Sequence, residues 1–160
     1  MFVPPVSDDV ELITDRLVLR AWTGEELTAV LRGPRLGAWA PDFPADADQI
    51  IAAYAFDRPD GQRLITERDG GLVIGSIGLF GPPDDGVIEI GYGIVPSRRG
   101  AGYATEAVAS LAALTLTAPG VQAVQANVDP NNPASIRVLE KSGFRPFTVD
   151  PTSARYRIEP

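Results

Sequence analysis

The clearest hydrophobic pattern in this 160-residue chain is an alternation within residues 87–95. Successive side chains of a β-strand point to opposite sides, so the pattern predicts a strand with one buried face. The other face combines Glu89 with Gly91 and Gly93, and glycine inside a strand often marks a place where a ligand approaches the backbone. The apolar face would carry Ile88, Ile90, Tyr92 and Ile94.

Similar patterns divide the rest of the chain into strands and helices. Thr23 and Glu26 predict a capping box at the start of one helix, and Asn132 before Pro133 predicts the start of another. We expect a single α/β domain, residues 1–160, around a mixed sheet. The predicted strands are 11–21, 63–67, 72–80, 87–95, 122–129, 144–149 and 154–158; the predicted helices are 24–31, 46–56, one from about 104 that ends before Pro119, and one from 133 that ends at Gly143; residues 82–86 are expected to form a loop.

The turn after the central strand has the composition of an anion site. Gly100 and Gly102 permit a tight turn and close approach to the backbone, and the helix that follows begins with unpaired amide groups. Arg98 and Arg99 add positive charge in a form that grips phosphate. A diphosphate would fit this turn, whereas the alternative is an ordinary connection with solvated arginines.

The phrase Arg99-x-x-Gly102-x-Ala104 resembles the pyrophosphate-binding motif of the GNAT acyltransferase superfamily. Residues 99–107 (RGAGYATEA) and 14–20 (TDRLVLR) are similar to the Rim-type branch, the ribosomal-protein N-acetyltransferases and their relatives. Residues 127–144 resemble the second cofactor motif of the family, N-x-x-S followed by E-K-x-G-F.

This resemblance implies a splayed, mostly antiparallel sheet of six to seven strands flanked by about four helices. It also implies acetyl-CoA as cosubstrate, held between the strands that end near Val95 and Val128, and transfer of the acetyl group to a primary amine by direct attack. The cofactor-binding residues carried over from the family are Ile94, Val95, Arg98, Arg99, Gly100, Ala101, Gly102, Tyr103, Ala104, Thr105, Asn127, Asn132 and Ser135.

Composition restricts the chemistry that the chain can perform. It contains no cysteine and no histidine, which excludes a thiol nucleophile, an imidazole base, and thiolate or histidine metal sites. The net charge of −7 disfavours a nucleic-acid partner and is compatible with a cationic amine. No signal peptide or membrane-spanning stretch is evident, and we expect a cytoplasmic protein without a metal.

Two side chains are the candidates for catalysis. Glu89 is the expected general base, acting through water, and its alternative is an ion pair with a nearby arginine. Ser135 is the expected donor to the leaving thiolate, and its alternative is helix capping. Tyr103 is a second candidate donor, because Leu139 occupies the position at which many members of the family carry a tyrosine.

The acceptor remains open between a protein N-terminus, an aminoglycoside-like antibiotic, a polyamine and an amino acid. Trp39, Phe43 and Tyr54 are candidates to line its pocket together with Glu89, although core packing is the simpler expectation for each aromatic residue. Asp42, Asp46 and Asp48 could meet a cationic group or serve only as caps. A homodimer is compatible with the sequence, and a non-catalytic acyl-CoA-binding module is the alternative function.

Overall fold

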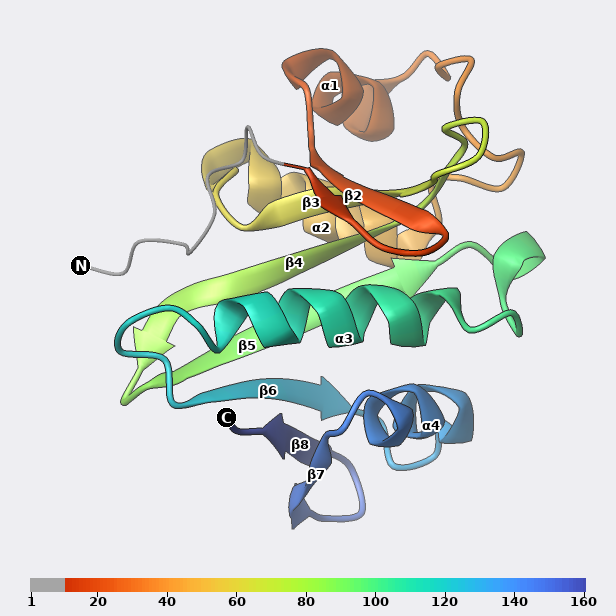
Figure 1. Ribbon diagram of the computed structural model, residues 1–160. Helices are drawn as coiled ribbons and strands as arrows, with labels where there is room; N and C mark the ends of the chain where they lie inside the picture. Colours follow the sequence, from red (N-terminus) through yellow and green to blue (C-terminus); the bar gives the residue numbers. More distant parts are fainter. Residues whose placement is uncertain (1–10) are drawn as a thin grey trace.

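A computed structural model describes residues 11–160, in which eight strands form one sheet with four α-helices and one short 3₁₀ helix (Figure 1). The fold class expected from the sequence is therefore confirmed. The strands are β1 (Leu12–Ile13), β2 (Leu17–Ala21), β3 (Gln62–Glu67), β4 (Val73–Asp84), β5 (Val87–Ile94), β6 (Ala123–Val128), β7 (Arg145–Val149) and β8 (Ala154–Ile158); the helices are α1 (Gly24–Arg32), α2 (Asp46–Asp57), η1 (Pro96–Arg98), α3 (Tyr103–Thr115) and α4 (Pro133–Lys141).

The strand order is β1-β2-β3-β4-β5-β6-β8-β7, and β5 with β6 is the one parallel pair of this sheet. Their ladder starts at Val87 and Ala123 and stops at Glu89 and Gln125. Beyond that point β5 continues to Ile94 without a partner on its β6 side, so the two strands diverge (Figure 1).

The two faces of the sheet are covered by different helices. Ile88 and Ile90 are buried on the face that α3 and α4 cover, and β2 presents Leu17 and Leu19 to the same core. Helix α2 packs on the opposite face, where Ala47 lies directly against Gly93. The faces predicted from the alternation in β5 are thus confirmed.

The predicted strand 11–21 is wrong as a single element, because a turn at Thr14 divides it into β1 and β2. The Thr14 hydroxyl accepts a hydrogen bond from Leu17 N at 3.0 Å, and Thr14 N donates to Leu17 O at 2.9 Å. Leu12 then pairs with Leu19 in an antiparallel ladder. This division accounts for eight strands where six to seven were expected.

The loop predicted for residues 82–86 is also shorter than expected. Asp84 pairs with Val87, so β4 continues past an irregular segment after Phe80. Only Asp85 and Gly86 form the turn, both with positive φ (52° and 80°), as in a two-residue hairpin connection.

The predicted helix starts agree with the structure. Thr23 and Glu26 form the capping box of α1, and Asn132 caps α4 by accepting from Ser135 N at 3.2 Å. Gly143 has the left-handed φ of 97° expected after the end of α4. Within residues 11–160, no helix is both long and apolar enough to cross a membrane. The expectation that no signal peptide is present concerns residues 1–10, which lie outside the described part.

Candidate active site

The divergence of β5 and β6 places two helix starts at one edge of the sheet. Because β5 and β6 are parallel, their carboxyl ends meet at the same edge, and α3 follows β5 as α4 follows β6. Gly102 precedes α3 with φ 85° and offers no side chain to cap it. The first bond of the helix runs from Glu106 N to Gly102 O, so the amides of residues 103–105 have no intrahelical acceptor. This edge can therefore receive an anion.

The two arginines before this turn are held in different ways. Arg99 donates from Nε to Ile94 O at 2.8 Å and is otherwise exposed, which leaves its terminal nitrogens available. Arg98 pairs through Nε with Glu67 at 3.3 Å, so much of its charge is matched within the protein. Arg99 is the better placed of the two to meet an external anion.

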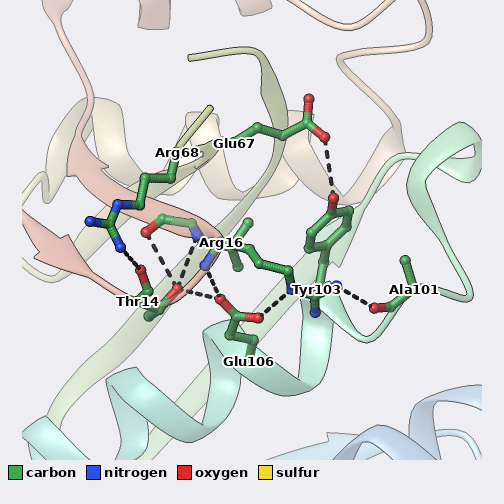
Figure 2. Close-up of polar contacts among 8 residues, drawn as sticks. Thr14, Arg16, Glu67, Arg68, Ala101, Tyr103 and Glu106 are labelled. Carbon is green, nitrogen blue, oxygen red and sulfur yellow. Dashed lines mark hydrogen bonds and ion pairs between the residues drawn. The ribbon is translucent and has the colours of Figure 1, made fainter. Parts of the chain in front are cut away.

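A polar cluster fixes the first turn of α3 against the β1–β2 turn (Figure 2). The Glu106 carboxylate accepts from Thr14 Oγ1 at 2.5 Å, from Arg16 N at 2.8 Å and from Arg16 Nε at 2.8 Å. Arg16 also donates from Nη1 to Ala101 O at 2.8 Å, and its guanidinium lies 4.4 Å from the centre of the Tyr103 ring. We call Thr14, Arg16 and Glu106 the brace, since they tie the glycine turn to β2.

The environment of Glu106 favours its charged form. Partial burial would raise its pKa, but the hydrogen bonds from Thr14 and from the Arg16 backbone and side chain outweigh burial, and the pKa of Glu106 is lowered. Sequence reasoning did not assign this role. The sequence did contain an indication of it, because all three residues belong to the Rim-like phrases: Thr14 and Arg16 to residues 14–20, and Glu106 to residues 99–107.

Tyr103 faces away from the strand divergence. Its phenol donates to Glu67 Oε2 at 3.4 Å (Figure 2). This contact lies beside an open hollow of about 580 Å³ that Glu67, Arg68 and Arg16 also line. Because this hydroxyl is already engaged with a carboxylate, Tyr103 is the weaker of the two candidate proton donors.

Ser135 lies in the first turn of α4, and its hydroxyl makes no hydrogen bond within residues 11–160. The cap is made by the Asn132 side chain and the Ser135 amide, so capping does not require the hydroxyl. The Tyr92 phenol, which the sequence placed only on a buried face, reaches across from β5 to Ser135 O at 3.5 Å. Burial raises the pKa of Tyr92, which keeps its hydroxyl protonated.

Glu89 lies at the last rung of the parallel ladder. Its Oε1 accepts from Asn127 Nδ2 at 2.7 Å, and it forms no ion pair within the described residues, so the expected alternative of an arginine partner is not found there. Glu89 borders a second hollow of about 680 Å³. The residues that line it are Phe80, Pro82, Asp84, Asp85, Val87, Glu89, Gln122, Ala123, Gln125, Asn127, Arg155, Arg157 and Glu159.

The glycines beside Glu89 have a packing role. A Cβ on Gly91 would lie 2.7 Å from the Phe80 ring, and one on Gly93 would lie 2.7 Å from the Ala47 Cβ. The chain's own side chains therefore occupy the space above both glycines. Phe80 is held in turn by Tyr54, with ring centres 4.7 Å apart, and the Tyr54 hydroxyl bonds Gly81.

The other expected acceptor residues lie apart from this hollow. Trp39 and Phe43 are 6% and 0% exposed and stack edge-to-face at 5.1 Å, in the core packing given as their alternative. Asp42 accepts from the Ser97 amide and hydroxyl, which lowers the Asp42 pKa. Asp48 is buried and accepts from Ser76 Oγ at 2.5 Å.

Sequence comparison relates the chain to acetyltransferases. Residues 16–145 match the model of the family described as "Acetyltransferase (GNAT) domain". YoaA, an uncharacterized N-acetyltransferase of Bacillus subtilis (strain 168), is 30% identical over 145 residues, 84% of this chain and 82% of YoaA. YjdG of the same organism is 34% identical over 95 residues, and the match spans 59% of this chain but only 55% of YjdG. The L-2,4-diaminobutyric acid acetyltransferase of Nocardia farcinica (strain IFM 10152) is 34% identical over 123 residues, 70% of this chain and 62% of that protein.

Solved structures agree in fold. An acetyltransferase of the GNAT family from Bacillus anthracis superimposes with a TM-score of 0.72 at 18% identity, covering 94% of this chain and 98% of its own. Mycobacterium smegmatis RimJ, solved in complex with CoA-disulfide, gives a TM-score of 0.61 at 22% identity, covering 89% of this chain and 81% of its own. The matched family model spans most of the chain and the fold is the same, so the protein belongs to the GNAT acetyltransferase family.

Proposed function

We propose that this protein is an N-acetyltransferase that moves an acetyl group from acetyl-CoA to a primary amine within a ternary complex. The observation that carries the proposal is the end of the β5–β6 ladder at Glu89 and Gln125. Past this rung the backbone groups of β5 on that side lack ladder partners, and the uncapped start of α3 lies at the same edge. An extended chain that ends in a diphosphate would find hydrogen-bonding backbone and an anion site in one line.

The residues of this edge fit acetyl-CoA, which supplies the activated acetyl group. The amides of residues 100–105 and the free end of Arg99 would hold the diphosphate, and Gly100 presents an open approach because nothing lies within 4 Å of its Cβ position. Backbone groups at Ile94, with Asn132 across the divergence, would bind the arm that leads to the thioester. Val95 would contribute less than the sequence suggested, because its N–H donates to Ile74 O at 2.9 Å and its carbonyl accepts from Arg98 N at 3.0 Å. Asn127 would contribute indirectly, by orienting Glu89.

The acceptor amine must lose a proton before it can attack. Lysine-like amines have pKa values of about 10.4, so most are protonated at neutral pH. Glu89 would take this proton through water while the nitrogen forms its bond to the acetyl carbon and the carbon–sulfur bond breaks. The Ser135 hydroxyl would donate to the departing sulfur, with the Tyr92 hydroxyl next to it, because Ser135 keeps a free hydroxyl on the α4 side of the divergence.

We place the chain in the Rim-type branch on the basis of its 14–20 and 99–107 phrases. The acceptor is proposed to be a small amine or a protein N-terminus. The relative from Nocardia farcinica, named for diaminobutyric acid, favours the small amine.

The test combines binding with turnover. Acetyl-CoA should raise the melting temperature whereas NAD and ATP should not, because a ligand that binds only the folded state stabilises it. CoA release over a panel of amines and short peptides, with mass spectrometry of products, should then find an acceptor. Glu89→Gln should retain acetyl-CoA affinity and lose about 10²-fold in kcat, with partial recovery at high pH as the free amine becomes available.

Glu25→Gln is the matched control, since Glu25 is exposed in the first turn of α1 and makes the same change in charge. If Glu89→Gln turned over at the wild-type rate from about pH 6 to 9, Glu89 would have no role as the base in the proposed mechanism. Acetyl-CoA binding without CoA release for any amine would instead favour a non-catalytic binding module.

A further inference from the structure

Two arginines of β8 lie on the same face of the sheet as Glu89. Opposed residues of neighbouring strands share a face, and Arg157 opposes Gln125 while Arg155 opposes Asn127. Gln125 is in turn the rung partner of Glu89. Glu89 and Arg157 are thus two strand spacings apart, about 10 Å between backbones, a span that their side chains can close around a small molecule.

The charge of both arginines is available to a ligand. Among residues 11–160 neither arginine forms an ion pair, and the Arg155 side chain has no hydrogen bond. Arg157 is positioned: its Nε donates to Gln125 Oε1 at 2.8 Å, and its guanidinium lies 3.6 Å from the centre of the Phe147 ring. Held in this way, its terminal nitrogens can grip a carboxylate with little loss of side-chain entropy.

Opposite charges are separated along this hollow. Asp84 and Glu159 lie toward its other end, because Asp84 pairs with Val87 at the start of β5 and Glu159 follows the end of β8. Arg155 lies on the side toward which β5 and β6 diverge, two residues beyond the level of Glu89. A ligand with its amine at Glu89 therefore lies next to positive charge on β8, which disfavours an acceptor that carries only amines.

From this arrangement we infer that the acceptor carries a carboxylate as well as the reacting amine, as an amino acid or a diamino acid does. The inference rests on the proposed acetyl transfer and names the substrate class for the same site. The amine lies at Glu89, and the carboxylate lies between Arg155 and Arg157. A polyamine matches Glu89 and Asp84 but offers no anion to either arginine.

The experiment compares acceptors that differ only in the carboxylate. L-lysine is tested against cadaverine and L-lysinamide, and L-2,4-diaminobutyrate against 1,3-diaminopropane. The first readout is kcat/KM for CoA release, and the second is affinity by calorimetry with CoA present, which needs no turnover. We expect the better of the two acids to exceed its partners without a carboxylate by about 10- to 100-fold in both readouts, as a charge-assisted hydrogen bond allows.

Arg155→Gln should lower this acid-to-amide ratio by about tenfold, and the double change with Arg157→Gln should abolish it. Comparing this ratio between variant and wild type cancels the intrinsic reactivity of each amine. Arg155 is the safer single change, because its side chain makes no hydrogen bond or ion pair within residues 11–160. Arg32→Gln, an exposed arginine at the end of α1, has the same effect on net charge and should leave the ratio intact.

Equal affinity for acids and amides, or a ratio unaffected by Arg155→Gln, overturns the inference and leaves the acetyl transfer in place. Preference for cadaverine over lysine also overturns it, in favour of a polyamine. Carboxylate-dependent affinity without CoA release keeps the inferred binding site and refutes the proposed transfer.

Discussion

Replacing Glu106 tests whether the brace serves both stability and cofactor binding. Glu106→Gln keeps the size of the side chain but turns one acceptor oxygen into a donor. One of its three hydrogen bonds, from Thr14 Oγ1, Arg16 N or Arg16 Nε, must then face an N–H₂ group. The remaining contact from Arg16 Nη1 to Ala101 O depends on the same guanidinium orientation.

The expected loss of stability follows from how far the Glu106 and Arg16 side chains are exposed to solvent. The Glu106 side chain is 19% exposed and that of Arg16 is 44% exposed, so the ion pair itself deserves only the value of a surface pair, about 0.2–1 kcal/mol. Loss of one hydrogen bond to a partly buried charge adds about 1 kcal/mol. We therefore expect Glu106→Gln to lower the free energy of unfolding by about 1–2 kcal/mol. Acetyl-CoA affinity should fall by about 3- to 10-fold as the glycine turn loosens.

The stabilisation that Glu106 provides should depend on pH in a direction set by its lowered pKa. Folding lowers the pKa of Glu106, whose value in the unfolded chain is about 4.3. The stabilisation is therefore complete above about pH 5 and is lost as the pH falls through the folded pKa. Urea unfolding of wild type and variant between pH 3 and pH 8 should show a constant gap that closes at the acidic end.

Glu26→Gln is the matched control, since Glu26 combines an ion pair with Arg20 and hydrogen bonds at a helix start, remote from the glycine turn. It should cost stability without weakening acetyl-CoA binding. The reasoning fails if Glu106→Gln binds acetyl-CoA as wild type does, or if its stability gap persists unchanged at pH 3.

Two further predictions concern groups that the fold leaves in unusual settings. Ser135→Ala should lower kcat about tenfold while shifting the melting temperature little, because Asn132 already caps α4. Steady-state kinetics and thermal unfolding on one preparation measure both effects. A large loss of stability with kcat intact would instead assign the hydroxyl a structural role. Burial raises the pKa of Asp48 above the unfolded value of about 3.9, despite its hydrogen bonds from Ser76 and Ala45. The wild type should therefore lose stability relative to Asp48→Asn as the pH rises from about 4 through the folded pKa. Urea unfolding that shows a constant difference in stability between about pH 4 and 7 would contradict this.

Most elements could be predicted because their signals are local. Alternation in 87–95 and the Asn132-Pro133 helix start depend on neighbours in the sequence, and both agree with the structure. The division of 11–21 could not be predicted in this way. Its turn at Thr14 is fixed by Glu106, which is 92 residues away, so no window of adjacent residues contains the cause.

The candidate site shows the same limit. Its anion turn was visible as glycines beside arginines, but the pairing of Arg98 with Glu67 depends on β3. Gly91 was attributed to ligand approach, whereas its space is filled by Phe80 from the neighbouring strand. Arg155 and Arg157 carried no motif, and only the order β5-β6-β8 brings them to Glu89.

The single parallel pair explains why chemistry gathers at one edge of this sheet. Antiparallel neighbours can be joined by hairpins, whereas β5 and β6 need a crossover, and α3 provides it. The crossover sets the start of α3 at the carboxyl end of β5, and α4 begins at the matching end of β6. The uncapped amides at the start of α3 and the start of α4, which Asn132 caps, thus flank a gap that opens where the ladder stops at Glu89. Without histidine or cysteine, the proposed site combines an anion site, a carboxylate base and hydroxyl donors, because this topology brings the backbone itself into the site.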